Sequence, residues 1–292
     1  MRILFLCFVT TSLMASNSWK PKYQESEKIL ESITAKKSSK KIQAKKKVTK
    51  KRTKKSTTKK VSKAESKELQ KLRQNFRVNH KTKKGLSDLK KQTLALKQKS
   101  VPILVDVMKR SDYPDKNRWL ATFLLGRIMG VKSADFISKF VKHPNFLLRL
   151  ASLKTLLALK QDQYHGLYVE ALKDKAMIVR FEALELIRKL KIKKLAPYVW
   201  SMLYDKSNYA GSVGKRKRTN IIKTAIKTMG DLGFAKAKEP MLSMMQKKKY
   251  KDIYPELDYS LNLLSKNSSP KGSYQIKQRF WKRQAVAEKV IR

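Results

Sequence analysis

The sequence predicts an all-α protein of stacked helical hairpins, preceded by a disordered, lysine-rich N-terminal arm. Two observations lead to this prediction. Beyond residue 100 the chain repeats itself every 31 residues, as the spacing of Arg118, Arg149 and Arg180 shows. Before the repeat, fifteen of the twenty-eight residues from Lys36 to Lys63 are basic and none is acidic, so this segment has too few apolar side chains to offset the entropy of ordering it.

Residues 1–15 have the pattern of a secretory signal peptide. Arg2 precedes an apolar stretch from Ile3 to Ala15, which polar residues follow, so cleavage is expected after Ala15. The stretch is shorter than the roughly 20 apolar residues of a transmembrane helix. The single cysteine, Cys7, would leave with the signal, so no disulfide or thiolate metal site is expected in the mature chain. The rival interpretation is an uncleaved apolar start on a cytoplasmic protein.

Residues 16–63 are predicted to be the disordered arm, which becomes lysine-rich from Lys36 onward. The formal net charge of the whole chain is +48, which indicates a polyanionic partner. The residues of the arm predicted to bind a polyanion are Lys36, Lys37, Lys40, Lys41, Lys45, Lys46, Lys47, Lys50, Lys51, Arg52, Lys54, Lys55, Lys59, Lys60 and Lys63.

A linker with a short helix is predicted over residues 64–85. Leu69, Leu72 and Phe76 mark an amphipathic segment there. It either caps the first repeat or forms a partly ordered helix within the linker.

The repeat region is predicted to span residues 86–266. Within one unit Val179, Ala183 and Leu186 recur at helical intervals, and Pro197 fits the first turn of a second helix. Each unit is therefore expected to be a helical hairpin. A single hairpin cannot bury its apolar face, so neighbouring hairpins must stack.

The segment from Asp174 to Ile187 resembles the D-x-x-x-x-V-R-x-x-A-x-x-x-L pattern of HEAT-like repeats, in particular the short type of phycobilisome lyases. The resemblance implies a right-handed α-solenoid. It also implies a ladder of aspartates and arginines at the turns between units. His143 stands where one unit would have the aspartate, and Gly211 stands where a fourth arginine would fall. The implied ladder residues are Asp112, Arg118, Arg149, Asp174, Arg180 and Asp205.

An insertion of eleven residues, Ser207 to Lys217, enlarges one unit. Its tip is predicted to be a second polyanion contact, with a solvated loop as the alternative. The tip residues are Lys215, Arg216, Lys217 and Arg218.

Residues 267–292 are predicted to form a basic C-terminal helix with Ile276, Phe280 and Ala287 near one face. Capping of the last repeat is favoured, and an anionic membrane surface is the alternative.

No catalytic, cofactor-binding or metal site is predicted. His80, His143 and His165 are the only histidines, and none has partners at metal-ligand spacing. The chain also has no phosphate-binding glycine loop and no nucleophile motif. A non-enzymatic protein without a cofactor is expected.

These features favour an exported scaffold, periplasmic or secreted, that its arm tethers to an envelope polymer, anionic lipid or nucleic acid. A protein partner on the solenoid face is a further expectation. The alternative is a cytoplasmic protein that binds nucleic acid regardless of sequence, and the third is a lyase or DNA glycosylase on the same fold.

Overall fold

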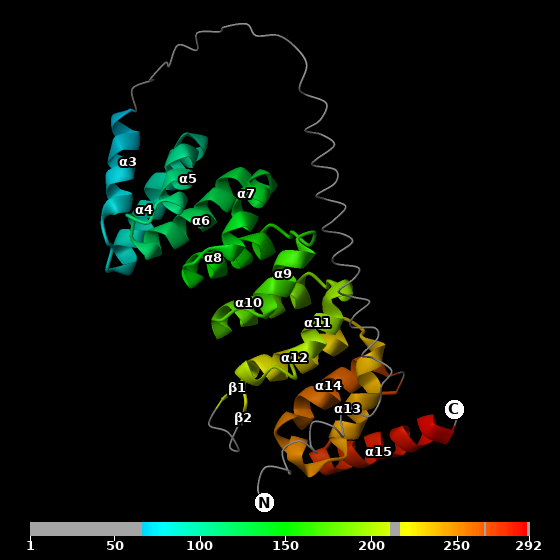
Figure 1. Ribbon diagram of the computed structural model, residues 1–292. Coiled ribbons are helices and arrows are strands. Elements are labelled where there is room, and N and C mark those ends of the chain that lie inside the picture. The colour runs from blue at the N-terminus through cyan, green and yellow to red at the C-terminus, as the bar shows by residue number, and fades with distance from the viewer. Residues whose placement is uncertain (1–65, 211–216, 266, 291–292) are drawn as a thin grey trace, which may run out of the picture. The chain divides into compact units, whose positions relative to one another are not determined.

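The computed structural model describes residues 66–210, 217–265 and 267–290 (Figure 1). The predicted signal peptide, the predicted arm, and Lys215 and Arg216 of the loop tip lie outside the described residues. All of the described residues belong to one compact unit. The described part is mostly helical, and its only strands are two short ones. None of its helices combines the length and the apolarity needed to span a membrane.

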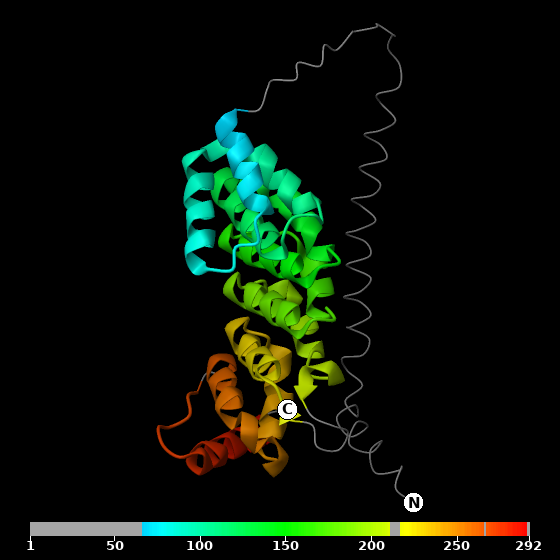
Figure 2. The ribbon, with the colours of Figure 1, turned by 90° about the vertical axis from the view of Figure 1, so that its left-hand side faces the viewer.

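One layer of the fold consists of the first helices of successive hairpins. Each contacts the first helix of the next hairpin, so the hairpins lie against one another in chain order (Figures 1 and 2). These helices are α4 (Lys83–Ala95), α6 (Asp115–Met129), α8 (Phe146–Ala158), α10 (Met177–Lys189), α12 (Asn220–Asp231) and α14 (Tyr254–Leu264).

The second helices form the other layer, and each also packs on the first helix of the following hairpin. Every hairpin therefore buries an apolar face against its neighbour, as a stack of repeats requires. The second helices are α5 (Val101–Lys109), α7 (Ala134–Ser138), α9 (His165–Leu172), α11 (Ala196–Ser201) and α13 (Lys238–Met245).

Small residues allow the first helices to approach closely. Ala121, Ser152 and Ala183 recur at the repeat spacing and are fully buried. At Gly230 of α12, a Cβ atom would lie 2.8 Å from the Cα atom of Ser260 in α14. A larger side chain there would push the two helices apart, so this residue sets their separation.

Helix α3 (Lys67–Arg77) covers the first hairpin. Leu72 and Phe76 are fully buried, and α3 packs on α4 and α5. The buried amide of Asn117 donates to the carbonyl oxygens of Phe76 and Val78 at 2.7 and 2.8 Å. These bonds satisfy carbonyls that the end of a helix leaves without partners. The helix therefore caps the stack rather than lying free in a linker.

Helix α15 (Tyr274–Val290) closes the other end by packing on α13 and α14. Its buried anchor is Trp281, which the sequence analysis did not single out. Ile276, placed on the predicted apolar face, is 40% exposed, and Ala287 is also exposed. The predicted apolar face was wrong, because the orientation of α15 is set by the indole of Trp281, which forms a hydrogen bond to the stack.

The insertion leaves and returns through a two-residue antiparallel ribbon. Strand β1 (Tyr209–Ala210) pairs with β2 (Lys217–Arg218), with Tyr209 opposite Arg218. The ribbon brings Arg218 next to the start of α12.

Candidate polyanion interface

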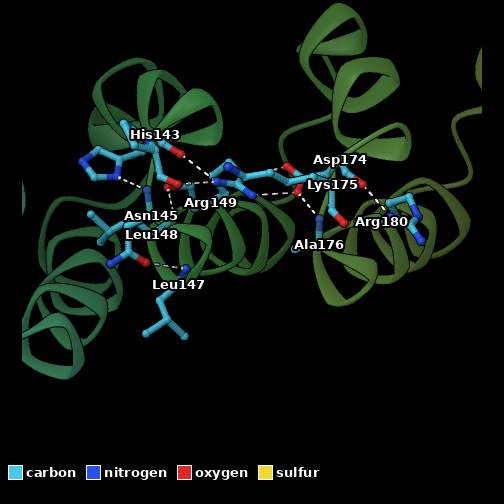
Figure 3. A network of polar contacts seen from close by, with 11 residues as sticks. His143, Asn145, Leu147, Leu148, Arg149, Asp174, Lys175, Ala176 and Arg180 are labelled. Atoms are coloured by element: carbon cyan, nitrogen blue, oxygen red, sulfur yellow. Dashed lines mark hydrogen bonds and ion pairs between the residues drawn. The ribbon is translucent and has the colours of Figure 1, made fainter. Parts of the chain in front are cut away.

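The turns between consecutive hairpins form one side of the described stack, and there arginines join neighbouring units. Arg149 donates from Nε and Nη2 to the two carboxylate oxygens of Asp174 at 2.6 and 2.7 Å (Figure 3). Its Nη1 donates to the carbonyls of His143 and Pro144 at 2.9 and 2.8 Å. Arg149 is 5% exposed, so this two-bond pair forms largely away from water, where such pairs are strong.

Arg180 repeats this arrangement with another partner. Its Nη1 donates to the carbonyl of Asp174 at 2.6 Å, but its Nε donates to the side-chain oxygen of Asn208 at 2.8 Å. Asp205, the expected partner, instead accepts a bond of 2.8 Å from the N–H of Ser207. The insertion begins here, and it brings the amide of Asn208 to the place that the repeat spacing gave to Asp205.

Arg118 faces His143, with 3.3 Å between Nη2 and Nε2. The N–H of Asn145 donates to His143 Nδ1 at 3.0 Å, so Nε2 carries the proton of the neutral ring and cannot accept from the arginine. The Nε atom of Arg118 is buried without a hydrogen-bond partner in the described structure. Burial, and then the nearby positive charge of Arg118, lower the pKa of His143.

Asp112 does not join the ladder. It pairs with Arg110 at 2.6 Å on the exposed surface, and hydrogen bonding to Arg110 lowers its pKa. We use the name arginine ladder for Arg118, Arg149 and Arg180 together with the residues that they face, His143, Asp174 and Asn208.

The structure describes two of the four predicted tip residues, Lys217 and Arg218, and their surroundings differ. Lys217 is exposed. Arg218 donates to Asp252 at 2.7 Å and to the carbonyl of Lys249 at 3.2 Å, and its guanidinium lies 4.8 Å from the Tyr250 ring centre. Arg218 therefore joins two hairpins as the ladder arginines do, one step beyond Arg180.

The turns within the hairpins form the opposite side and carry a different set of charges. These five turns, residues 96–100, 130–133, 159–164, 190–195 and 232–237, hold one carboxylate, Asp162. All of their lysines are exposed. We call these lysines the lysine edge; they are Lys97, Lys99, Lys132, Lys160, Lys191, Lys193, Lys194 and Lys236.

Contacts between neighbouring units show that these turns lie along one side. Tyr164, in one turn, donates to Asp135 just beyond the preceding turn at 2.6 Å. Burial and this bond raise the pKa of Tyr164 to about 12. Asp231, at the end of α12, accepts from Tyr259 of α14 at 2.6 Å and lies 3.8 Å from Arg188 at the end of α10.

Three residues of the lysine edge have an unusual backbone. Lys97, Lys160 and Lys191 have φ values of 47°, 53° and 51°, while glycines occupy the positive-φ positions of two other turns. The turns at Lys160 and Lys191 are closed by the same pair of backbone bonds as the turn at Gly233. Glycine is the usual residue at such a helix end because a side chain is strained there.

Sequence reasoning missed the lysine edge because it compared surface positions on the second helices. The sequence signal that could have identified it is a lysine two residues after the first helix of a repeat. Lys160 and Lys191 lie at this position and are 31 residues apart. The left-handed backbone at these positions could not be read from the sequence, because lysine is not a residue that favours it.

The first helices also carry a row of partly exposed apolar side chains that the sequence analysis did not identify. Phe146 and Met177, at equivalent positions, are 44% and 45% exposed. The others are partly buried, and Trp119 and Phe123 contact each other with ring centres 4.6 Å apart. We call this set the apolar row; its members are Trp119, Phe123, Phe146, Leu150, Met177 and Phe181.

Among the described residues, no cluster of histidine, cysteine or carboxylate side chains could hold a metal ion. His80 contacts the carbonyl of Asn75 at 3.0 Å, and His165 begins α9. A comparison with models of known protein families finds no match, and a comparison with curated proteins finds no significant match.

Proposed function

We propose that the protein is an exported, non-enzymatic scaffold, a right-handed HEAT-like α-solenoid tethered by its lysine-rich arm to a polyanion. The stacked hairpins and the pair between Arg149 and Asp174 support the HEAT-like part of the proposal. The observation that carries the binding function is the charge of the chain. Fifteen basic residues without one acidic residue between Lys36 and Lys63 provide electrostatic affinity for anionic polymers of any sequence.

The location of the protein tests the first part of this proposal. The measurement is the intact mass of the native protein together with its cell fraction. A chain that begins near Ser16 in the periplasm or the medium supports export and an envelope polymer as the partner. A full-length chain in the cytosol contradicts it and makes nucleic acid the leading partner.

Deletion of residues 36–63 tests the tether. We expect the deletion to remove most of the affinity for an anionic polymer while the circular dichroism of the helical part stays unchanged. For intact protein on duplex DNA, the logarithm of the binding constant should fall with log salt at a slope of about −0.9 per phosphate neutralised. A nearly flat slope, or unchanged binding after the deletion, contradicts the tether.

A second candidate function, docking of a protein, is favoured by the apolar row. Two of its side chains, at equivalent positions of neighbouring helices, are nearly half exposed, and contiguous exposed apolar surface is typical of interaction sites. Lys116, Lys223 and Lys227 lie on the helices that carry or flank the row, and no described residue forms an ion pair with them. The charge of +48 opposes self-association. The occupant that fits is therefore an acidic amphipathic helix of another protein.

Synthetic peptides test this docking. An acidic amphipathic helix should bind the intact protein, and a scrambled peptide of the same composition should not. Phe146→Ser with Met177→Ser should weaken the first interaction without changing the helical content. Equal binding of the two peptides contradicts a docking site at the apolar row.

A further inference from the structure

We propose that the lysine edge is a second polyanion-binding surface, built into the folded part, which takes a linear phosphate or phosphodiester chain lying along the stacked turns. The inference rests on the proposed function, because it concerns the same class of partner. It concerns a different part of the protein, since the sequence analysis placed the polyanion-binding residues in the arm and the loop tip.

The charge of these turns is the first argument. Within these turns, eight exposed lysines stand against the single carboxylate of Asp162. Asp135 and Asp231 lie just outside the turns on the same side and accept hydrogen bonds from Tyr164 and Tyr259. None of the eight lysines forms an ion pair with any residue that the structure describes. By contrast, the turns between consecutive hairpins place Asp174 against Arg149 and Asp252 against Arg218. Lysines along one side of the stack repel one another and together attract an anionic chain.

The backbone of the turns is the second argument. Lys97, Lys160 and Lys191 occupy the left-handed conformation that Gly233 adopts without strain in an equivalent turn. A side chain in this conformation costs stability, and the favourable interaction of a cation with a helix C-terminus offsets only part of that cost. Backbone strain of this kind gathers at functional positions. We therefore explain the use of lysine in place of glycine at these three turns by the binding of an anionic chain to its charge.

The spacing and the lack of aromatic partners identify the class of ligand. Packed helices lie about 8–10 Å apart, so the stacked turns present cations at regular steps along a line. A flexible linear polyanion can follow such a line. No exposed aromatic side chain lies in the described turns, since Tyr164 and Phe234 are both partly buried. Stacking with bases is thus absent from the recognition, and lysine supplies point charges for phosphate groups.

The experiment uses the full-length protein with Lys97→Gly, Lys160→Gly and Lys191→Gly combined. The probes are a polythymidine strand and inorganic polyphosphate, and binding is measured over a range of salt concentrations. On a single strand, each lost phosphate contact makes the salt slope shallower by about 0.7, so we expect a decrease of about 2 with polythymidine. With polyphosphate we expect the slope to become shallower as well. We also expect a melting temperature no lower than that of the unchanged protein, because glycine relieves the backbone strain.

The matched control is Lys173→Gln, Lys175→Gln and Lys206→Gln combined. These lysines are exposed and lie toward the turns of the arginine ladder, so the control removes the same charge from the opposite side. Its salt slope should stay close to that of the unchanged protein. An unchanged slope in the glycine variant, or an equal decrease in the control, overturns the lysine edge and leaves the tethered scaffold standing. A flat slope in the unchanged protein contradicts the proposed function itself.

Discussion

Arg149 and Asp174 lie 25 residues apart in the chain and join two hairpins through a pair of parallel hydrogen bonds. Asp174 also accepts a bond of 2.8 Å from the N–H of Ala176, so one carboxylate both closes its own turn and holds the preceding arginine. Both side chains are nearly buried, at 6% and 10% exposure. Removing either side chain would leave the other as a buried charge without a partner, and this destabilises the fold because the charge has lost its hydration.

Arg149→Ala is therefore expected to lower the free energy of unfolding by about 3–5 kcal/mol, the usual effect of removing one partner of a buried pair. Urea unfolding followed by circular dichroism measures it. Lys142→Ala is the control, because Lys142 pairs with Glu170 at 2.7 Å on the exposed surface. Such exposed pairs contribute about 0–1 kcal/mol. Similar losses in the two variants would show that the buried pair has no special role.

His143→Asp is expected to stabilise the protein by about 1.5–3 kcal/mol, the range for hydrogen bonds to charged groups. The aspartate would accept from Arg118, whose Nε now has no partner in the described structure. It would also keep the turn, since Asp174 accepts from Ala176 as His143 accepts from Asn145. The midpoint of urea unfolding measures the gain.

His143→Asn separates charge from shape in that experiment. The amide can accept from the arginine but carries no charge, so its gain should be smaller than that of the aspartate. A destabilised aspartate variant would show that the Arg118 site cannot reproduce the geometry of Arg149.

The stability of the unchanged protein is expected to fall as the pH is lowered below the ordinary histidine value of about 6.5. The folded protein lowers the pKa of His143, so the stability linked to its neutral ring is present above the unfolded pKa. That stability is lost as the pH falls through the lowered, folded value. Unfolding curves at about pH 7.5 and pH 5 measure the difference, which should shrink in His143→Gln. An equal fall in both proteins would assign the pH dependence to other groups.

The periodicity of the chain predicted the helices well because repeat columns such as Ala121 and Ala183 are set by packing alone. The resemblance to HEAT-like repeats also implied a ladder that includes Arg149 and Asp174, and the two residues do pair. The 31-residue spacing could not foresee that Asn208 would replace Asp205 as the partner of Arg180, because the insertion changes the register of the chain. Nor could it place Arg218, predicted as a polyanion contact, against Asp252. Such substitutions depend on which side chain reaches a given point in space, and sequence spacing does not contain that information.

Asp258 holds the C-terminal helix, and Asp258→Ala is expected to release it. The Oδ1 atom accepts from Ser269 Oγ and Trp281 Nε1 at 2.7 and 2.8 Å, and the Oδ2 atom accepts from Lys277 Nζ at 2.6 Å. Without the carboxylate, the fully buried indole of Trp281 loses its hydrogen-bond acceptor. Limited trypsin digestion measures the release, because freed Lys277 and Arg279 become accessible to cleavage, and the mass of the product locates the cut.

The same carboxylate gives this attachment a pH dependence. Burial alone would raise the pKa of Asp258, but the hydrogen bonds from Lys277, Ser269 and Trp281 outweigh burial and lower it. The attachment is thus fully present above the ordinary carboxylate pKa and is lost only as the pH falls through the lowered value.

Asp162→Ala is the control for the trypsin experiment, because it removes an exposed carboxylate far from α15. If its digestion pattern changes as much as that of Asp258→Ala, net charge and not the buried carboxylate governs how firmly the helix is held.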